Sequence, residues 1–144
     1  EGLAFYWGKA GPVIGKIVAP AADKPTAGYS FAILDADNGD VLFNGFDHGW
    51  VWNAVRSADW VDEDTVVIGA GSQRNYSYYI IDTSVTGGEL VDEIELNDDR
   101  FTDLYGVNVS PDGTMIASHF AELNASGDFV RNWDVVTRFA APPE

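Results

Sequence analysis

The sequence predicts an all-β fold built from antiparallel sheets, because three observations agree. Short runs of β-branched and aromatic residues recur along the 144-residue chain, as at Thr65–Gly69 and Tyr78–Ile81, and these residue types favour strands. Turn-forming residues separate such runs, including Asn-Gly at 38–39 and Pro-Asp-Gly at 111–113. Apolar residues do not recur at helical spacing over three turns in any segment.

The first third of the chain predicts four strands, at residues 3–7, 13–19, 29–35 and 41–45. The third and fourth of these flank the Asn-Gly pair at 38–39, which indicates a hairpin. We expect a type I′ turn here, because both central residues of that turn need a positive φ and Asn-Gly adopts it readily.

The rest of the chain predicts two more groups of strands. One group is expected at 50–56, 65–70, 77–82 and 89–96, and the other at 104–109, 114–120 and 129–136. A fourth strand of the last group is either missing or lies at 137–140. The only plausible helical stretch is Phe120–Asn124, which is shorter than an isolated helix needs for stability.

Two sets of internal matches indicate a repeat. Phe31–Asp35 resembles Tyr78–Asp82, and Val55–Asp59 aligns with Val107–Asp112. The two sets move together, so the chain repeats a four-stranded unit of roughly 50 residues, which is typical of antiparallel β-propeller blades. We therefore expect a single propeller-type domain over 1–144, with about three blades near 1–48, 49–99 and 100–140.

One turn and one strand resemble a known repeat family. The stretch Ser110–Ala117 (S-P-D-G-T-M-I-A) resembles the S-P-D-G-x-x-I-A turn of TolB-like, WD-type β-propeller repeats, and Tyr79–Asp82 followed by Gly87–Glu89 resembles their next strand and turn. The first blade lacks the S-P-D-G element. The resemblance implies a propeller that binds protein partners at one end and is located in the periplasm or outside the cell.

About three blades are too few for a closed ring, because propellers typically have 4–8. The chain is therefore expected to be a fragment of a longer protein or a subunit of a homo-oligomer. Two copies that complete a ring of about six blades would be the simplest assembly.

Charge and composition exclude several classes of partner. The 23 acidic and 8 basic residues give a net charge of −15, which repels phosphate backbones and predicts no nucleic-acid partner. The chain has no cysteine, so disulfides and thiolate metal sites are absent. No apolar run approaches the ~18 residues of a membrane span.

Catalytic and metal-binding patterns are weak, so we predict no catalytic residue, no metal and no cofactor. The two histidines, His48 and His119, are far apart and lack cysteine companions for zinc. No G-x-S-x-G motif accompanies Ser118 and His119 as a hydrolase nucleophile. The acidic loop Asp35–Asp40 lacks the order of a calcium-binding EF-hand loop.

These observations favour a non-catalytic binding module that engages a protein partner, or a small ligand, through acidic loops containing aromatic residues. The residues expected to bind, in loops at one end, are Asp59, Trp60, Asp62, Asp112 and His48. Trp60 lies in an acidic segment and is expected to be exposed. Two alternatives remain: a propeller segment of a larger enzyme such as a prolyl-oligopeptidase-like peptidase, and a structural subunit of an extracellular assembly.

Overall fold

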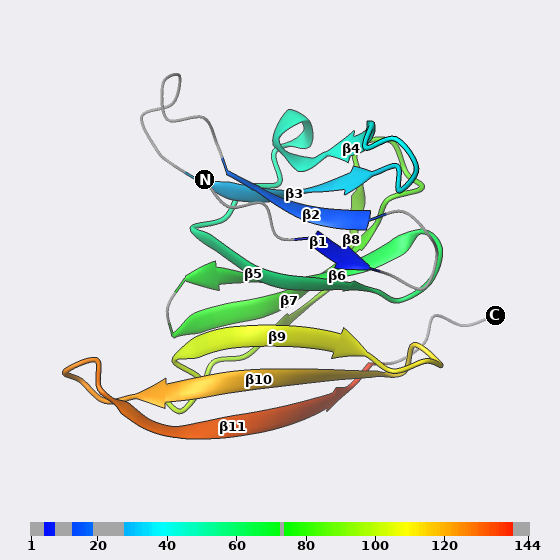
Figure 1. Cartoon of the computed structure of the whole chain (residues 1–144). Coiled ribbons are helices and arrows are strands. Elements are labelled where there is room, and N and C mark those ends of the chain that lie inside the picture. Colours follow the sequence, from blue (N-terminus) through cyan, green and yellow to red (C-terminus); the bar gives the residue numbers. More distant parts are fainter. Residues whose placement is uncertain (1–4, 8–12, 19–27, 73, 140–144) are drawn as a thin grey trace.

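The structure, a computed structural model, describes residues 5–7, 13–18, 28–72 and 74–139 (Figure 1). These residues form three antiparallel sheets and one short 3₁₀ helix, η1 (Gly45–His48). The prediction of an all-β fold with antiparallel sheets is thus confirmed. Within the described residues, no helix is long and apolar enough to cross a membrane.

Each sheet is a meander in which strands that follow one another in the chain are neighbours. Sheet 1 contains β1 (Phe5–Trp7), β2 (Val13–Val18), β3 (Tyr29–Leu34) and β4 (Val41–Asn44). Sheet 2 contains β5 (Ala54–Trp60), β6 (Thr65–Ser72), β7 (Asn75–Asp82) and β8 (Glu89–Glu95). Sheet 3 contains β9 (Asp103–Val109), β10 (Met115–Leu123) and β11 (Phe129–Arg138).

Sheet 2 lies between the other two sheets, and its two faces carry separate apolar clusters (Figure 1). Phe31 of β3 packs with Trp60 and Ile68 between sheets 1 and 2. Val67 of β6 belongs instead to the cluster between sheets 2 and 3, together with Phe120 of β10. Alternate residues of β6 thus face opposite clusters, which explains why this strand is a continuous apolar run.

The strand expected at 50–56 is the main error in strand position, since β5 begins at Ala54. The residues before it bond to sheet 1. Tyr29 and Trp52 exchange backbone hydrogen bonds of 2.8 and 2.9 Å, and the Trp50 N–H donates to the Gly45 carbonyl at 3.0 Å. Trp52 thus pairs with Tyr29 of β3 in an isolated bridge, and Trp50 bonds to the first residue of η1, so this segment contacts the sheet 1 side rather than extending β5.

The short stretch Phe120–Asn124, which the sequence left without a stable helix, mostly belongs to β10, and this strand ends at Leu123 rather than at the expected residue 120. Phe120 pairs with Leu104 of β9 on one side and with Trp133 of β11 on the other. Ile116, Ser118 and Phe120 are buried, whereas Met115 and Ala117 are exposed, so burial follows the strand period of two. No fourth strand of sheet 3 is present in the described residues, and Thr137 and Arg138 belong to β11.

The two predicted turns have different outcomes. In the Pro-Asp-Gly turn the Gly113 N–H donates to the Ser110 carbonyl at 2.9 Å, and Gly113 has φ +72°, as expected. The type I′ turn at 38–39 is wrong, because Gly39 has φ +78° but Asn38 does not have a positive φ. The Gly39 N–H instead closes a wider loop on the Asp35 carbonyl at 2.8 Å.

Candidate binding surface at one end of the sheets

Four hairpin connections lie at the same end of the three sheets (Figure 1). We call this end the turn end, and it comprises residues 35–40, 61–64, 83–88 and 110–114. Neighbouring turns lie close together: the Thr83 N–H donates to the Asp64 carbonyl at 2.8 Å, and a Cβ on Gly113 would lie 3.3 Å from the Val61 carbonyl oxygen. A Cβ on Gly88 would lie 3.2 Å from the ring of Phe43 in β4, the strand that follows the turn at 35–40. The four turns therefore present one surface.

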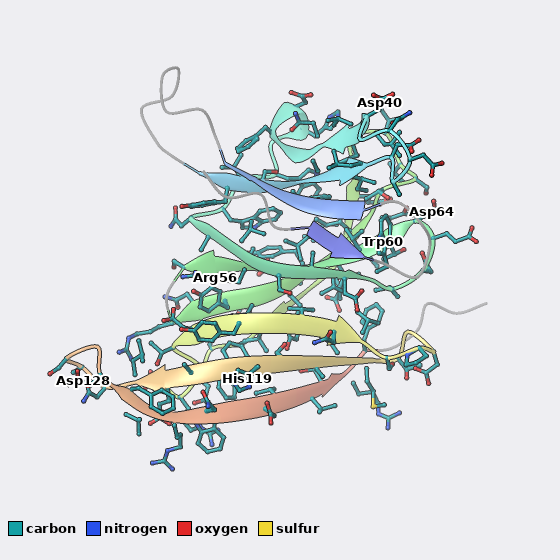
Figure 2. The ribbon with its side chains drawn as sticks, viewed as in Figure 1. Asp40, Arg56, Trp60, Asp64, His119 and Asp128 are labelled. Carbon is teal, nitrogen blue, oxygen red and sulfur yellow. The ribbon has the colours of Figure 1, made fainter. Side chains whose placement is uncertain are left out.

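The turn end is rich in exposed carboxylates. Figure 2 places Asp40 and Asp64 on this side of the molecule, and Arg56 and Asp128 on the opposite side. The exposed acidic residues of the four turns are Asp37, Asp40, Asp62, Glu63, Asp64 and Asp112. Of the arginines in the described residues, only Arg138, at the end of β11, reaches this end.

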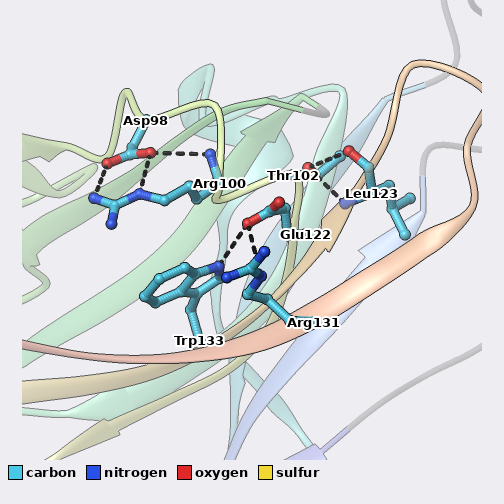
Figure 3. Close-up of polar contacts among 7 residues, drawn as sticks. All are labelled: Asp98, Arg100, Thr102, Glu122, Leu123, Arg131 and Trp133. Atoms are coloured by element: carbon cyan, nitrogen blue, oxygen red, sulfur yellow. Dashed lines mark hydrogen bonds and ion pairs between the residues drawn. The ribbon is translucent and has the colours of Figure 1, made fainter.

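At the opposite end, described arginines are paired with acidic side chains (Figure 3). Arg100 binds Asp98 through two hydrogen bonds of 2.6 and 2.9 Å, and Arg131 lies 3.7 Å from Glu122. The Arg100 side-chain hydrogen bond is the main reason why the pKa of Asp98 falls to about 2. The Trp133 indole N–H donates to Glu122 at 2.9 Å, and Arg100 lies 4.7 Å from the centre of a Trp133 ring. Arg56 also lies 3.9 Å from Asp103, so three of the four described arginines at this end lie beside a carboxylate, and Arg74 donates to the Asn124 carbonyl at 3.4 Å.

The carboxylate of Asp62 stabilises the backbone of the β5–β6 turn. Asp62 Oδ1 accepts from the backbone N–H groups of Asp64 at 2.9 Å and Thr65 at 2.8 Å. The Asp64 carbonyl accepts from the Thr83 N–H at 2.8 Å and from its hydroxyl at 2.7 Å, which joins this turn to the β7–β8 turn. The carboxylates of Glu63 and Asp64 extend from a turn whose backbone is fixed.

Between these two turns lies an open hollow of about 460 Å³, lined by Asp62, Glu63, Asp64, Thr65, Asp82 and Ser84. The Ser84 hydroxyl and N–H donate to Asp82 at 2.6 and 2.9 Å, and these bonds lower the pKa of Asp82. In the neighbouring turn, the hydroxyls of Ser110 and Thr114 donate to Asp112 and lower its pKa to about 2. Both carboxylates therefore stay charged well below neutral pH.

Asp59 and Trp60 are strand residues, not loop residues as the sequence indicated. Asp59 Oδ2 accepts from the Val109 N–H at 2.7 Å, so this carboxylate links β5 to the facing strand β9. Trp60 is 1% exposed and packs between sheets 1 and 2, so the expectation that it is exposed is wrong. As the last residue of β5, it points into the core although the next residues form an acidic turn.

The other three predicted residues are exposed and close to the turns. Asp62 and Asp112 lie in the β5–β6 and β9–β10 turns. His48 ends η1, with its ring centre 5.2 Å from that of Phe43 and its Nδ1 3.2 Å from a Cβ built on Gly87 of the β7–β8 turn. The structure thus brings His48, Asp62 and Asp112 to the turn end, and their role in binding stays a prediction.

The structure also corrects the internal alignment, which matched Val55–Asp59 with Val107–Asp112. The counterpart of Asp112 is Asp62, because each carboxylate caps the hairpin after the first strand of its sheet. Glu63 and Asp82 were not among the residues expected to bind, although both line the hollow at this end. Glu63 directly follows Asp62 in the same acidic turn, whereas Asp82 reaches the hollow from the end of β7.

Ser118 and His119 are not placed as a nucleophile and its base. The His119 Nδ1 lies 2.8 Å from Asp134 Oδ1 on the exposed face of sheet 3. The adjacent Ser118 is buried on the opposite face, where its hydroxyl bonds to the Tyr78 hydroxyl. Within the described residues, no group of three or more His, Cys, Asp or Glu side chains is placed to hold a metal ion.

Comparisons with known proteins give no relative. No protein-family model, curated protein or solved structure matches the chain. The functional argument therefore depends on the residues described above.

Proposed function

We propose that this chain is a non-catalytic binding module of the β-propeller type, which engages a basic protein partner through its turn end. The observation that carries the proposal is the distribution of charge. Exposed carboxylates gather on several neighbouring turns at one end, whereas three of the four described arginines at the other end pair with acidic side chains.

The arrangement of the sheets supports the propeller part of the proposal. Each sheet has sequential strand order, neighbouring sheets pack face to face, and the first strands β5 and β9 are in contact. Propeller blades have the same order and the same packing. Further blades would have to come from a second copy or from a longer chain, and the TolB-like resemblance favours a periplasmic or extracellular protein.

A basic protein fits the turn end better than the other charged partners considered. The net charge of −15 repels nucleic acid. A bound metal ion would need several converging ligands, whereas these carboxylates spread over separate turns and some are already occupied by turn hydrogen bonds. A spread of exposed charge instead steers an oppositely charged surface and raises its association rate.

The test is charge reversal of Glu63→Lys with Asp64→Lys, measured by binding of a fluorescent oligolysine peptide over a range of salt concentrations. Neither side chain caps its own turn, so the fold should be retained. We expect binding to weaken about tenfold at low salt and the salt dependence to become shallower. The matched control is Asp99→Lys with Asp128→Lys, which changes the same charge at exposed positions of the opposite end. If both double variants weaken peptide binding equally, binding depends only on net charge, and this result would contradict a specific binding surface at the turn end.

The exposed strand edges favour a second candidate, a structural subunit whose edge strands pair between chains. β11 has no neighbour on its outer side in the described residues, and Phe129 and Val136 on it are 61% and 66% exposed. Unpaired edges of this length readily bind another strand. Native mass spectrometry of a Val136→Lys variant distinguishes the two candidates, because a charge on the β11 edge should dissociate oligomers that pair through this strand and should leave binding at the turn end unchanged.

A further inference from the structure

A second hollow lies away from the turn end, between the segment that enters β5 and the β6–β7 hairpin. Its volume is about 330 Å³, and its walls are Gly28, Val51, Trp52, Asn53, Gly71, Ser72 and Asn75. The β6–β7 hairpin is at the opposite end of the sheets from the turns 61–64 and 83–88, because strands alternate in direction. The hollow is thus separate from the acidic surface.

The aromatic wall of this hollow is held in place before any ligand arrives. Trp52 is fixed at its backbone by the two hydrogen bonds to Tyr29, of 2.8 and 2.9 Å. Its ring stacks on Trp50 with 6.1 Å between ring centres and lies 5.1 Å from the ring centre of Tyr79. A wall that is already ordered adds little ordering cost when a ligand binds.

The hairpin wall depends on a close backbone approach. Gly71 has φ +142°, and a Cβ there would collide with the carbonyl oxygen of Asn75. Only glycine fits this position, and its pairing with Tyr76 keeps the hairpin backbone close to the hollow. Ser72 and Asn75 pair with each other at the ends of β6 and β7, so their side chains extend from paired strand ends rather than from a long loop.

The polar side chains around the hollow have free hydrogen-bonding capacity. Asn53, Ser72 and Asn75 make no side-chain hydrogen bond to another described residue. Each amide supplies both donors and an acceptor, and the hydroxyl supplies one donor and two lone pairs. Among the described residues, no ionisable side chain lines the hollow, so these walls offer a charged ligand no counter-charge for the hydration that it loses.

We propose that this hollow binds a neutral polyhydroxylated ring of monosaccharide size. Its volume is at the lower end of the range of small-molecule sites, roughly 300–1,000 Å³. Amide and hydroxyl groups match neighbouring sugar hydroxyls, which also donate and accept, while the indole of Trp52 offers an apolar surface to the C–H groups of the ring. This site is independent of the acidic turn end, so either can fail without the other.

The test is a ¹⁵N–¹H NMR titration of the full chain with glucose, galactose and N-acetylglucosamine, each added separately. We expect saturable shifts, with at least one sugar, that are confined to the amides of residues 28, 51–53, 71, 72 and 75, at millimolar dissociation constants. Glycerol and glucuronate are the comparison ligands: glycerol lacks the ring, and glucuronate adds a charge. The proposal is overturned if no sugar saturates these shifts by about 100 mM, which corresponds to negligible affinity. It is also overturned if glycerol or glucuronate binds as well as the best sugar.

Variants locate the site. Asn53→Ala and Asn75→Ala each remove one exposed side chain, and each should weaken binding by about two- to tenfold. Asn108→Ala, at an exposed position of β9 outside the hollow, is the matched control and should leave the dissociation constant unchanged. Ser72→Ala gives a third measurement should either asparagine variant fail to fold. If these variants of the hollow fold but bind the sugar with unchanged affinity, the proposal is overturned.

Discussion

The carboxylate of Asp59 offers the sharpest test of how sheets 2 and 3 are joined. Its Oδ2 accepts the Val109 N–H at 2.7 Å and its Oδ1 accepts the Trp60 N–H at 2.8 Å. Two residues earlier on β5, the hydroxyl of the buried Ser57 accepts a hydrogen bond from the Val107 N–H at 3.0 Å. Two side chains of β5 thus satisfy backbone donors of β9, where no strand hydrogen bonds reach between the sheets.

Replacing Asp59 by alanine should lower the free energy of unfolding by about 2–3 kcal/mol. A hydrogen bond to a charged group contributes about 1.5–3 kcal/mol, and the variant also leaves the Val109 N–H without its acceptor. Asp59→Asn keeps the shape and one acceptor oxygen, so its effect should be about half as large. Urea unfolding followed by tryptophan fluorescence gives the magnitude, and amide hydrogen exchange locates it.

In Asp59→Ala, amide hydrogen exchange should accelerate more at Val109 than at Ile80, which lies in the interior of sheet 2. The reason is that local opening around Val109 adds to the overall loss of stability. Asp99→Ala, at an exposed position outside the strands, should change stability by less than about 0.5 kcal/mol. Should Asp59→Ala match this control, or should Val109 keep its full protection, the link between β5 and β9 would be refuted.

Three further predictions concern the core and the turns. Trp60→Ala should cost about 3–5 kcal/mol in urea unfolding, because a fully buried indole is removed; a loss below about 1 kcal/mol would contradict its burial. Tyr78→Phe should cost about 1–2 kcal/mol in thermal unfolding, because the buried Ser118 hydroxyl loses its partner; Ser118→Ala in the same background should then cost little more. The pKa of Asp112, measured by carboxyl ¹³C NMR, should be about 2. Because this value is lower than in the unfolded chain, the charged carboxylate stabilises the fold above the unfolded pKa, and this stabilisation is lost as the pH falls through the folded pKa. Ser110→Ala should raise that midpoint, and an unchanged midpoint would refute the role of the hydroxyl.

Strand positions were predictable wherever the pattern is local. The run at Thr65–Gly69 is apolar and β-branched, and β6 starts at Thr65. The Pro-Asp-Gly turn behaved as expected, since Gly113 closes it with a positive φ. These features depend on the backbone preferences of a few consecutive residues, which are present in the sequence itself.

The candidate binding residues were predictable only in part. Asp62 and Asp112 lie in exposed turns, as their turn-forming neighbours indicated. Asp59 and Trp60 stand only a few positions earlier, yet one joins two strands and the other is buried. The side chain of a strand-end residue can point to either face of its sheet, and only packing against another sheet selects the face.

The sequence by itself determined the strand-rich composition, the turns and the strong negative charge of this protein. Tertiary structure alone decided that Trp52 pairs with Tyr29 of β3, that β10 continues beyond Phe120 to Leu123 and that Trp60 is buried. It also assembled the hollow beside Trp52, whose walls come from three separate segments. Local preferences act between neighbours in the chain, whereas strand pairing and burial depend on residues tens of positions away, which a local pattern does not specify.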